Sequence, residues 1–245
     1  MSMRKGIDVS KWQGSIDWNA VSASGIEFAI LKAGGSDAGF YRDPMFERNY
    51  VEAKAAGIPV GAYYFVGKNC TSYDDGVADA ERFIQILSDK QFEYPVYIDM
   101  ESTSMADKAG ATWACLGFVE TMEKAGYYCG IYASDIYGFK DRLDISRLGD
   151  IDKWVARYGS NPSYVTEHGM WQYSDKGSVN GISGNVDLDE AYKDYPAIIK
   201  AAGLNGFTAA EKPTEQPIDP AESNLKAENE KLSDMLKRIK DIVNE

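Results

Sequence analysis

The chain has 245 residues, of which 44% are hydrophobic and 26% are charged, so it is long enough to bury a sizeable core as a globular protein. Its formal net charge of -12 argues against a nucleic-acid partner, because phosphate binding needs clustered lysine and arginine. The chain has three cysteines, an odd number, and their spacing matches no metal-binding motif, so the sequence indicates neither a disulfide framework nor a zinc site.

The amino-terminal residues contain no apolar segment like that of a signal peptide. No run in the chain reaches the length of a membrane span. We therefore expect a protein that has no membrane partner and is made in the cytoplasm. If its target lies outside the cell, something else must release it.

Short segments with the composition of β-strands recur along the chain. Helix-compatible stretches are expected at 45–56, 74–88 and 112–124, and a further one at 188–201. The early alternation of strand and helix predicts parallel βαβ units. The eight expected strands lie at residues 5–9, 27–33, 59–65, 95–100, 128–133, 153–156, 170–173 and 185–188.

The later strands follow a different pattern from the early ones. The segment 157–169 contains Gly159, Pro162 and Gly169 and is too short and too broken for a crossover helix of ordinary length. An α/β barrel that begins as β/α units and ends in nearly bare strands fits this pattern better than a regular eightfold repeat.

The composition changes near residue 206. We expect a barrel at 1–205, a Pro-rich linker at 206–221 and a helix at 222–245. Apolar residues recur every seven positions in that helix, which predicts a short coiled coil, and Asn229 at an a position favours a homodimer over larger assemblies. An amphipathic helix folded back on the barrel is the alternative. The two seven-residue series are Leu225, Leu232, Ile239 and Asn229, Leu236, Val243.

Asp99 and Glu101 stand two residues apart in a hydrophobic strand, so both carboxylates should face the same side. Left unpaired, buried carboxylates cost several kcal/mol or take up a proton. One neutral acid beside one ionised carboxylate is what cleavage of a glycosidic bond requires. The plainer alternative is a solvated strand end with one carboxylate capping the following helix.

Asp8 lies near the carboxyl end of the first expected strand, the end of a β/α barrel where active sites are built. Taken together, six motifs resemble the glycoside hydrolase family 25 lysozymes, which are muramidases found in phage endolysins and bacterial autolysins. The resemblance covers residues 4 to 203. The motifs are D-V-S-K-W-Q-G at 8–14, G-I-P-V-G-A-Y-Y-F at 57–65, Y-I-D-M-E at 97–101, G-I-Y-A-S at 130–134, W-Q-Y-S at 171–174 and G-I-S-G-N-V-D at 181–187.

The resemblance implies an irregular TIM-like barrel, (β/α)5(β)3, with no metal and no cofactor. It implies a muramidase that hydrolyses the β-1,4 bond between N-acetylmuramic acid and N-acetylglucosamine in bacterial peptidoglycan, as a phage endolysin does after release from an infected cell. It makes Glu101 the general acid and Asp99 the carboxylate that supports it or the acetamido group. Asp8 and Asp187 are assigned to the same acidic cluster.

Aromatic side chains should line the cleft, because sugar rings stack on them through their apolar faces. We expect Tyr64, Tyr132 and Trp12 there, although each is also a reasonable core residue. Lys32, alone in an apolar strand, should pair with a carboxylate of the cluster. Gln172 should donate a hydrogen bond in the cleft.

Two rival functions remain at this stage. One is a non-catalytic wall-binding or virion structural protein that uses the barrel as a glycan platform and the carboxy-terminal helix for assembly. The other is a chitinase-like enzyme acting on uncrosslinked polymer. The four acidic residues argue against the first rival.

Overall fold

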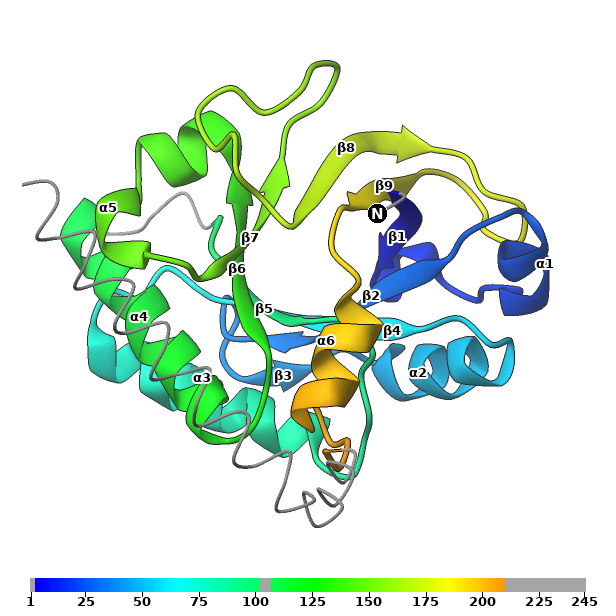
Figure 1. Ribbon diagram of the computed structural model, residues 1–245, viewed down its shortest axis with the longest axis horizontal. Coiled ribbons are helices and arrows are strands. Elements are labelled where there is room, and N and C mark those ends of the chain that lie inside the picture. The colour runs from blue at the N-terminus through cyan, green and yellow to red at the C-terminus, as the bar shows by residue number, and fades with distance from the viewer. Residues whose placement is uncertain (1–2, 102–106, 210–245) are drawn as a thin grey trace, which may run out of the picture. The chain divides into compact units, whose positions relative to one another are not determined.

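A computed structural model describes residues 3–101 and 107–209 of the chain (Figure 1). The expected helix at 222–245, and all but the first four residues of the expected linker at 206–221, lie outside the described residues. The described residues form one compact unit. None of the helices within the described parts is both long and apolar enough to cross a lipid bilayer.

Eight strands close into a barrel, as the sequence predicts. Seven run parallel, and β9 runs antiparallel to its neighbours β8 and β1, closing the ring. A two-residue strand, β3 (Tyr41–Arg42), extends the edge of β2. In order around the barrel the strands are β1 (Arg4–Val9), β2 (Phe28–Gly35), β4 (Val60–Phe65), β5 (Val96–Asp99), β6 (Cys129–Ser134), β7 (Asp152–Ala156), β8 (Met170–Gly177) and β9 (Val186–Ala191).

Helical segments follow each of the first five barrel strands, and the connections after β7 and β8 contain none, which confirms the (β/α)5(β)3 prediction (Figure 1). Side-chain caps start most of these helices; Ser72, for example, accepts a hydrogen bond from the Asp75 backbone N–H. The helices are α1 (Trp18–Ala23), α2 (Phe46–Ala55), α3 (Tyr73–Leu87), α4 (Lys108–Lys124), α5 (Ile145–Leu148) and α6 (Tyr195–Ala202).

The helix expected at 188–201 begins seven residues later than predicted. Leu188 belongs to β9, where it pairs with Ile7. The helix starts only after Asp194, which caps it by accepting from the Ala197 N–H, and Pro196 occupies the first turn. Tyr195 and Ile199 of this helix pack into the barrel interior, so α6 closes the amino-terminal end of the barrel.

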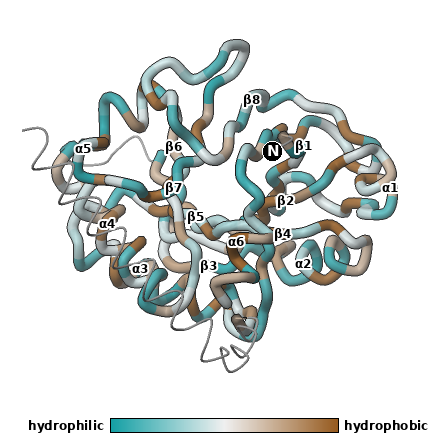
Figure 2. The backbone as a smooth tube through the Cα atoms, viewed as in Figure 1, coloured by the Kyte–Doolittle hydropathy of each residue, from teal (hydrophilic) through white to brown (hydrophobic). Residues whose placement is uncertain are grey.

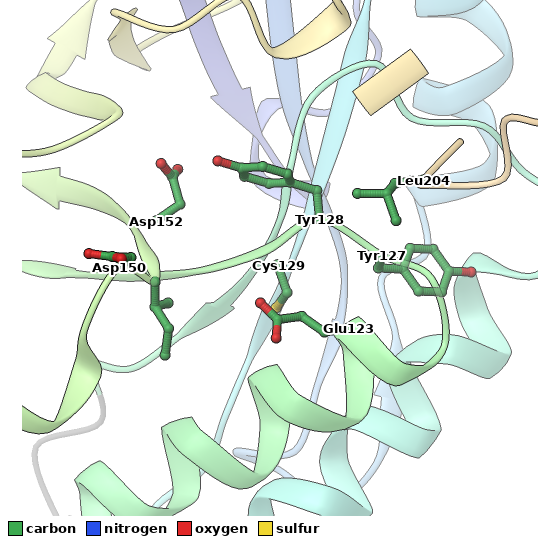
Figure 3. A pocket seen from close by; sticks show the side chains of 8 residues that line it. Glu123, Tyr127, Tyr128, Cys129, Asp150, Asp152 and Leu204 are labelled. Atoms are coloured by element: carbon green, nitrogen blue, oxygen red, sulfur yellow. The ribbon is translucent and has the colours of Figure 1, made fainter. Parts of the chain in front are cut away.

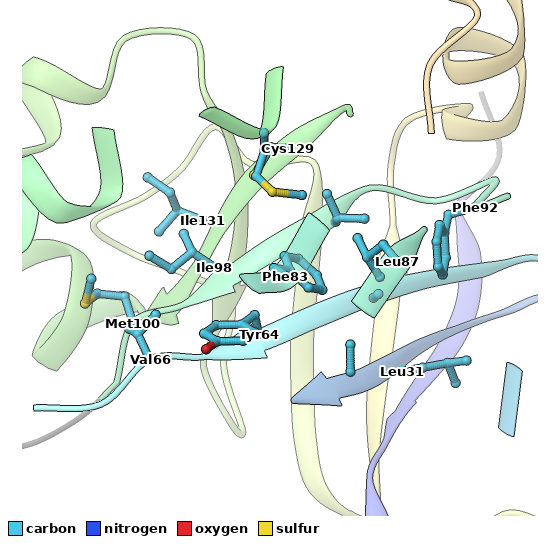
Figure 4. Close-up of a cluster of buried hydrophobic side chains, with 14 of the residues drawn as sticks. Leu31, Tyr64, Val66, Phe83, Leu87, Phe92, Ile98, Met100, Cys129 and Ile131 are labelled. Carbon is cyan, nitrogen blue, oxygen red and sulfur yellow. The ribbon is translucent and has the colours of Figure 1, made fainter. Parts of the chain in front are cut away.

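Side chains alternate along each strand between the inside and the outside of the barrel, so the buried apolar residues form two clusters, one on each face. The larger cluster lies between the barrel and the helices and includes Leu31, Phe83 and Ile131 (Figure 4). The second fills the barrel with rings such as Phe28, for which Gly6 leaves room where any side chain would collide. Figure 2 shows hydrophobic and hydrophilic residues interspersed along the elements, consistent with this alternation.

Candidate active site

Polar side chains replace the apolar ones where the inner face reaches the carboxyl ends of the strands. The strand register places Asp8 opposite Asp187 and Lys32 opposite Tyr63. Asp99 ends β5, and Glu101 follows it closely enough for its charge to raise the pKa of Asp99. The structure thus brings together four acidic residues predicted from three separate motifs.

Gln172 lies at the centre of a buried hydrogen-bond network. Its Nε2 donates to Asp8 Oδ2 at 2.7 Å. Its Oε1 accepts from the hydroxyl of Tyr132 at 2.9 Å and from the hydroxyl of Tyr158 at 2.8 Å. Because Gln172 is only 3% exposed, it positions Asp8 and the two tyrosines. It does donate a hydrogen bond, as expected, but the acceptor is a carboxylate of the cluster.

Tyr64 does not join the site, contrary to expectation. It points outward from β4 into the core between barrel and helices, where it packs against Phe83 (Figure 4), and its hydroxyl donates to Asp79. Its neighbour Tyr63 faces inward instead. There burial, followed by the charges of the surrounding carboxylates with Asp8 first, raises the pKa of the Tyr63 hydroxyl. Tyr63 is therefore the β4 aromatic that belongs to the acidic cluster.

Lys32 lies close to the carboxylates but within 4 Å of none of those described. Its ammonium group sits 4.4 Å from the ring centre of Phe65 and 5.7 Å from that of Tyr63. Its positive charge lowers the pKa of both Asp99 and Glu101, opposing the effect of burial. Lys32 thus supplies a cation to this part of the site without a direct ion pair.

Burial sets the protonation of the acidic cluster. It raises the pKa of Asp99 well above its usual range, and the charge of Glu101 adds to that shift. Burial also raises the pKa of Glu101, which is nevertheless the more open of the two side chains. Asp99 Oδ1 is buried and has no hydrogen-bond partner among the described residues. Burial therefore favours the protonated form of Glu101 relative to a solvated glutamate, and a carboxyl oxygen without a partner among the described residues lies beside it.

A groove of about 510 Å³ leads away from Glu101 along the ends of β6 and β7. Its walls include the rings of Tyr132, Tyr137 and Tyr158. Tyr137 and Tyr158 are among the exposed aromatic residues of the protein. Trp12, on the helical turn that follows β1, is 80% exposed and so is free to contact a ligand. Open aromatic rings beside carboxylic acids are typical of a site that binds and cleaves a glycan.

Comparisons with known proteins agree with this geometry. The model for glycosyl hydrolases family 25 matches residues 7–182. The chain belongs to that family. The autolytic lysozyme of Clostridium acetobutylicum is 33% identical over 238 residues, which make up 96% of this chain and 66% of that protein, so this chain spans slightly less than two thirds of its length.

Solved structures support the same assignment. The crystal structure of the CTP1L endolysin has a TM-score of 0.70 and 28% identity, covering 81% of this chain and 70% of that one. The bacterial lysozyme from Streptomyces coelicolor has a TM-score of 0.65 and 28% identity, covering 85% of this chain and all of that one. The family 25 barrel is therefore shared along most of the described residues.

Asp135, which no sequence motif indicated, anchors one wall of the groove. Asp135 is 1% exposed and lies on a π-helical turn, Asp135–Lys140. Its carboxylate accepts hydrogen bonds from the backbone N–H groups of Ser163, Tyr164 and Val165 and pairs with Arg157 at 2.8 Å. Burial alone would raise its pKa, but these hydrogen bonds together lower it.

Removing that anchor should loosen the groove wall. In Asp135→Ala, three backbone N–H groups and Arg157 lose their acceptor, and we expect a loss of about 3 kcal/mol in the free energy of unfolding. Limited proteolysis should cut within 157–169 faster than in the unmodified protein. Asp144→Ala, which removes an exposed helix cap in the same β6–β7 connection, is the control. Equal proteolysis of both variants would contradict the anchoring role.

A second pocket, of about 480 Å³, lies at the amino-terminal ends of β6 and β7, away from the acidic cluster (Figure 3). Three acidic residues line it, Glu123, Asp150 and Asp152. The buried one, Asp152, already accepts hydrogen bonds from Tyr97, Tyr195 and Lys193. At this end of a β/α barrel, polar networks serve stability. Within the described parts of the chain, no group of three or more His, Cys, Asp or Glu side chains is arranged to hold a metal ion.

The acidic cluster should make folding stability depend on pH. A carboxyl whose pKa is higher in the folded than in the unfolded chain destabilises the fold once it must ionise. Burial, followed by the charge of Asp175, raises the pKa of Asp187 from 3.8 to about 6. Discounted for partial exposure, this shift corresponds to about 1–2 kcal/mol lost as the pH rises from 4 to above 6.

We therefore expect a higher Tm near pH 5 than at pH 8, by a few degrees at ~2–4 °C per kcal/mol. Three other aspartates have lowered pKa values in the folded chain: Asp75, Asp135 and Asp144. Protonation of these carboxylates should destabilise the protein only below about pH 4. Thermal melts in buffers of equal ionic strength test this. A Tm that rises steadily from pH 5 to pH 8 would be inconsistent with a strained acidic cluster.

Proposed function

We propose that the chain is a peptidoglycan muramidase that hydrolyses the β-1,4 bond between N-acetylmuramic acid and N-acetylglucosamine. The observation that carries this proposal is the pairing of an open, partly desolvated Glu101 with a buried Asp99 at the carboxyl end of a family 25 barrel. The autolytic lysozyme and the endolysin to which the chain is similar support the choice of cell wall as substrate.

Glu101 would act as the general acid. Burial holds its pKa above the usual range, so a larger fraction carries a proton near neutral pH than for a solvated glutamate. In the proposed reaction, that proton passes to the glycosidic oxygen as its bond to the anomeric carbon breaks, and a water molecule finally supplies the hydroxyl of the new reducing end.

Asp99 would orient the acetamido group of the substrate. Its buried Oδ1 has no hydrogen-bond partner among the described residues, and an acetamido N–H is a donor that could satisfy it. The amide oxygen could then approach the anomeric carbon as the leaving group departs. This arrangement favours substrate assistance over a covalent glycosyl-enzyme intermediate.

Sugar binding would use the open aromatic rings beside the acids. Tyr158 is 48% exposed and its hydroxyl is held by Gln172, so its ring can stack on a sugar without losing much side-chain freedom. Tyr132, also held by Gln172, is only 6% exposed and lines the groove from beneath. Trp12 is a further stacking residue on the turn after β1. Lys32 places a positive charge beside Asp99 and Glu101, where it lowers the pKa of both and so limits the upward shift caused by burial.

A loss of turbidity in a suspension of purified bacterial walls tests the proposal against its rivals. We expect lysis of walls and no release of sugar from chitin. Binding to walls without lysis would favour the non-catalytic glycan platform. Release from chitin that equals or exceeds release from walls would favour the chitinase-like enzyme.

Residues 222–245 would join two copies of the chain as a short coiled coil. Helices of about three heptads are marginal alone in water, so self-association is the means by which this one would persist. Two catalytic units on one stalk would bind a polymer with a gain from effective concentration. We also propose that the protein is made in the cytoplasm and reaches the wall after release.

Deleting residues 210–245 should separate wall affinity from catalysis. The cut belongs at 210, because Gly206 accepts a hydrogen bond from Gln91 and Phe207 packs against the barrel cluster. We expect unchanged cleavage of short soluble fragments and slower lysis of intact walls. Light scattering on the full chain provides the control: a monomer at tens of micromolar would rule out the coiled coil.

A further inference from the structure

Asp189 is a fully buried carboxyl that the proposed reaction does not use. It has 0% exposure and lies on the inner face of β9, one step deeper in the barrel than Asp187. Its Oδ1 accepts a hydrogen bond from Trp154 Nε1 at 2.8 Å. Its Oδ2 is buried and has no donor among the described residues. A buried charged oxygen without a donor is costly, so Asp189 requires an explanation.

The neighbours of Asp189 are acidic. Strand pairing gathers the three carboxyls: Asp8 lies opposite Asp187 across β1 and β9, and Asp189 lies opposite Gln172, whose amide donates to Asp8. Burial, followed by the charges of Asp189 and Asp187, raises the pKa of Asp8. None of the ion pairs among the described residues involves any of these three groups. Tyr173 lies on the other side of the sheet, where burial, then the charge of Glu190 and then that of Asp189 raise its pKa. Two carboxyls in contact without a cation share a proton.

The hydrogen bonds indicate which group keeps the proton. Asp8 already accepts from Gln172, and Asp187 is only partly buried, so each can carry a charge at lower cost. Asp189 is the deepest of the three, and its free oxygen is the one without a donor. A proton on Asp189 Oδ2 satisfies that oxygen and gives Asp8 a second donor besides Gln172.

We propose that Asp189 is a positioning residue that stays protonated and donates a hydrogen bond from Oδ2 to Asp8, fixing Asp8 as an anion beneath the cleft. Asp189 touches neither substrate nor reacting atoms and acts only through Asp8. The activity-based part of its test rests on the muramidase proposal, which makes Asp8 part of the catalytic cluster.

Two substitutions of Asp189 test whether its hydrogen bond to Asp8, and not its ability to titrate, is what the site requires. In Asp189→Asn, the amide oxygen can accept from Trp154 while the amide nitrogen donates to Asp8, so the network persists without a titratable group. In Asp189→Leu, Trp154 loses its acceptor and Asp8 loses its donor. We expect kcat/KM on wall fragments to fall at least ~10-fold in the leucine variant and to be rescued to within about threefold by asparagine.

The pH profile distinguishes positioning from a merely structural role. Losing a donor raises the pKa of Asp8, so the acid limb of the kcat/KM profile should move to higher pH by about half a unit or more in Asp189→Leu. In Asp189→Asn the limb should stay where it is in the unmodified protein. An asparagine variant that folds but is as inactive as Asp8→Asn would overturn the proposal.

Infrared difference spectroscopy tests the proton directly and needs no activity. At pH 7, the spectrum of the unmodified protein minus the spectrum of Asp189→Asn should show the carbonyl band of one protonated carboxyl. Loss of an ionised carboxylate band instead would overturn the proposal, whatever the substrate proves to be. Because the leucine variant is not needed for this readout, the test holds even if that variant fails to fold.

Discussion

Glu101→Gln should abolish all but a trace of wall lysis while leaving the barrel folded. The amide keeps the shape of the side chain but has no proton to give to the glycosidic oxygen. General acid catalysis contributes roughly 10²- to 10⁴-fold, so kcat should fall by that factor while KM changes little. Initial rates on soluble peptidoglycan fragments measure both constants.

Glu190→Gln is the matched control for that substitution. Glu190 lies on β9, one residue along the strand from Asp189 and therefore on the opposite face, where it accepts from the Tyr192 hydroxyl. It should retain nearly full activity and a similar Tm. A folded Glu101→Gln protein that lyses walls at close to the unmodified rate would remove Glu101 from the mechanism.

Asp99→Asn should lower kcat by ~10²-fold or more, because a carbonyl and an NH₂ group replace the carboxylate that orients the acetamido group. The same change should raise the Tm at pH 7, since burial, followed by the charge of Glu101, raises the pKa of Asp99 in the folded chain. Lost activity with gained stability separates a catalytic defect from misfolding. Substrates lacking the acetamido group should show little difference between the two proteins.

Two other outcomes for Asp99→Asn would contradict this role. If Asp99→Asn were less stable and inactive, Asp99 would be an ionised structural acceptor. If it were more stable and fully active, the buried Oδ1 would have no role toward substrate. Thermal melts and initial rates on one preparation decide between these outcomes.

The alternation of side chains along strands made much of the site predictable from the sequence. Asp99 ends β5 and Asp8 lies one residue before the end of β1, so their shared location follows from the barrel. Glu101 was expected on the same strand as Asp99 but lies just beyond the end of β5, so alternation alone does not place it. The adjacent pair Tyr63 and Tyr64 shows where this reasoning fails. Both residues suit either face, and only the register of β4 against Lys32 decides that Tyr63 faces inward.

Long-range contacts limited the rest of the prediction. Gln172 contacts Asp8 across 164 positions of sequence, so nothing near Gln172 indicates that its amide is already engaged. Asp135 binds backbone N–H groups, which carry no side-chain signature in the sequence. The late start of α6 does have a local signal, because Asp194 followed by Pro196 is a typical helix start.

Mass spectrometry of a peptidoglycan digest tests the central claim most directly. Walls digested with the full chain and then reduced with borohydride should yield soluble fragments that end in reduced N-acetylmuramic acid, and Glu101→Gln should yield none. Fragments ending in reduced N-acetylglucosamine, or peptides freed from intact glycan strands, would contradict the assignment of this chain as a muramidase.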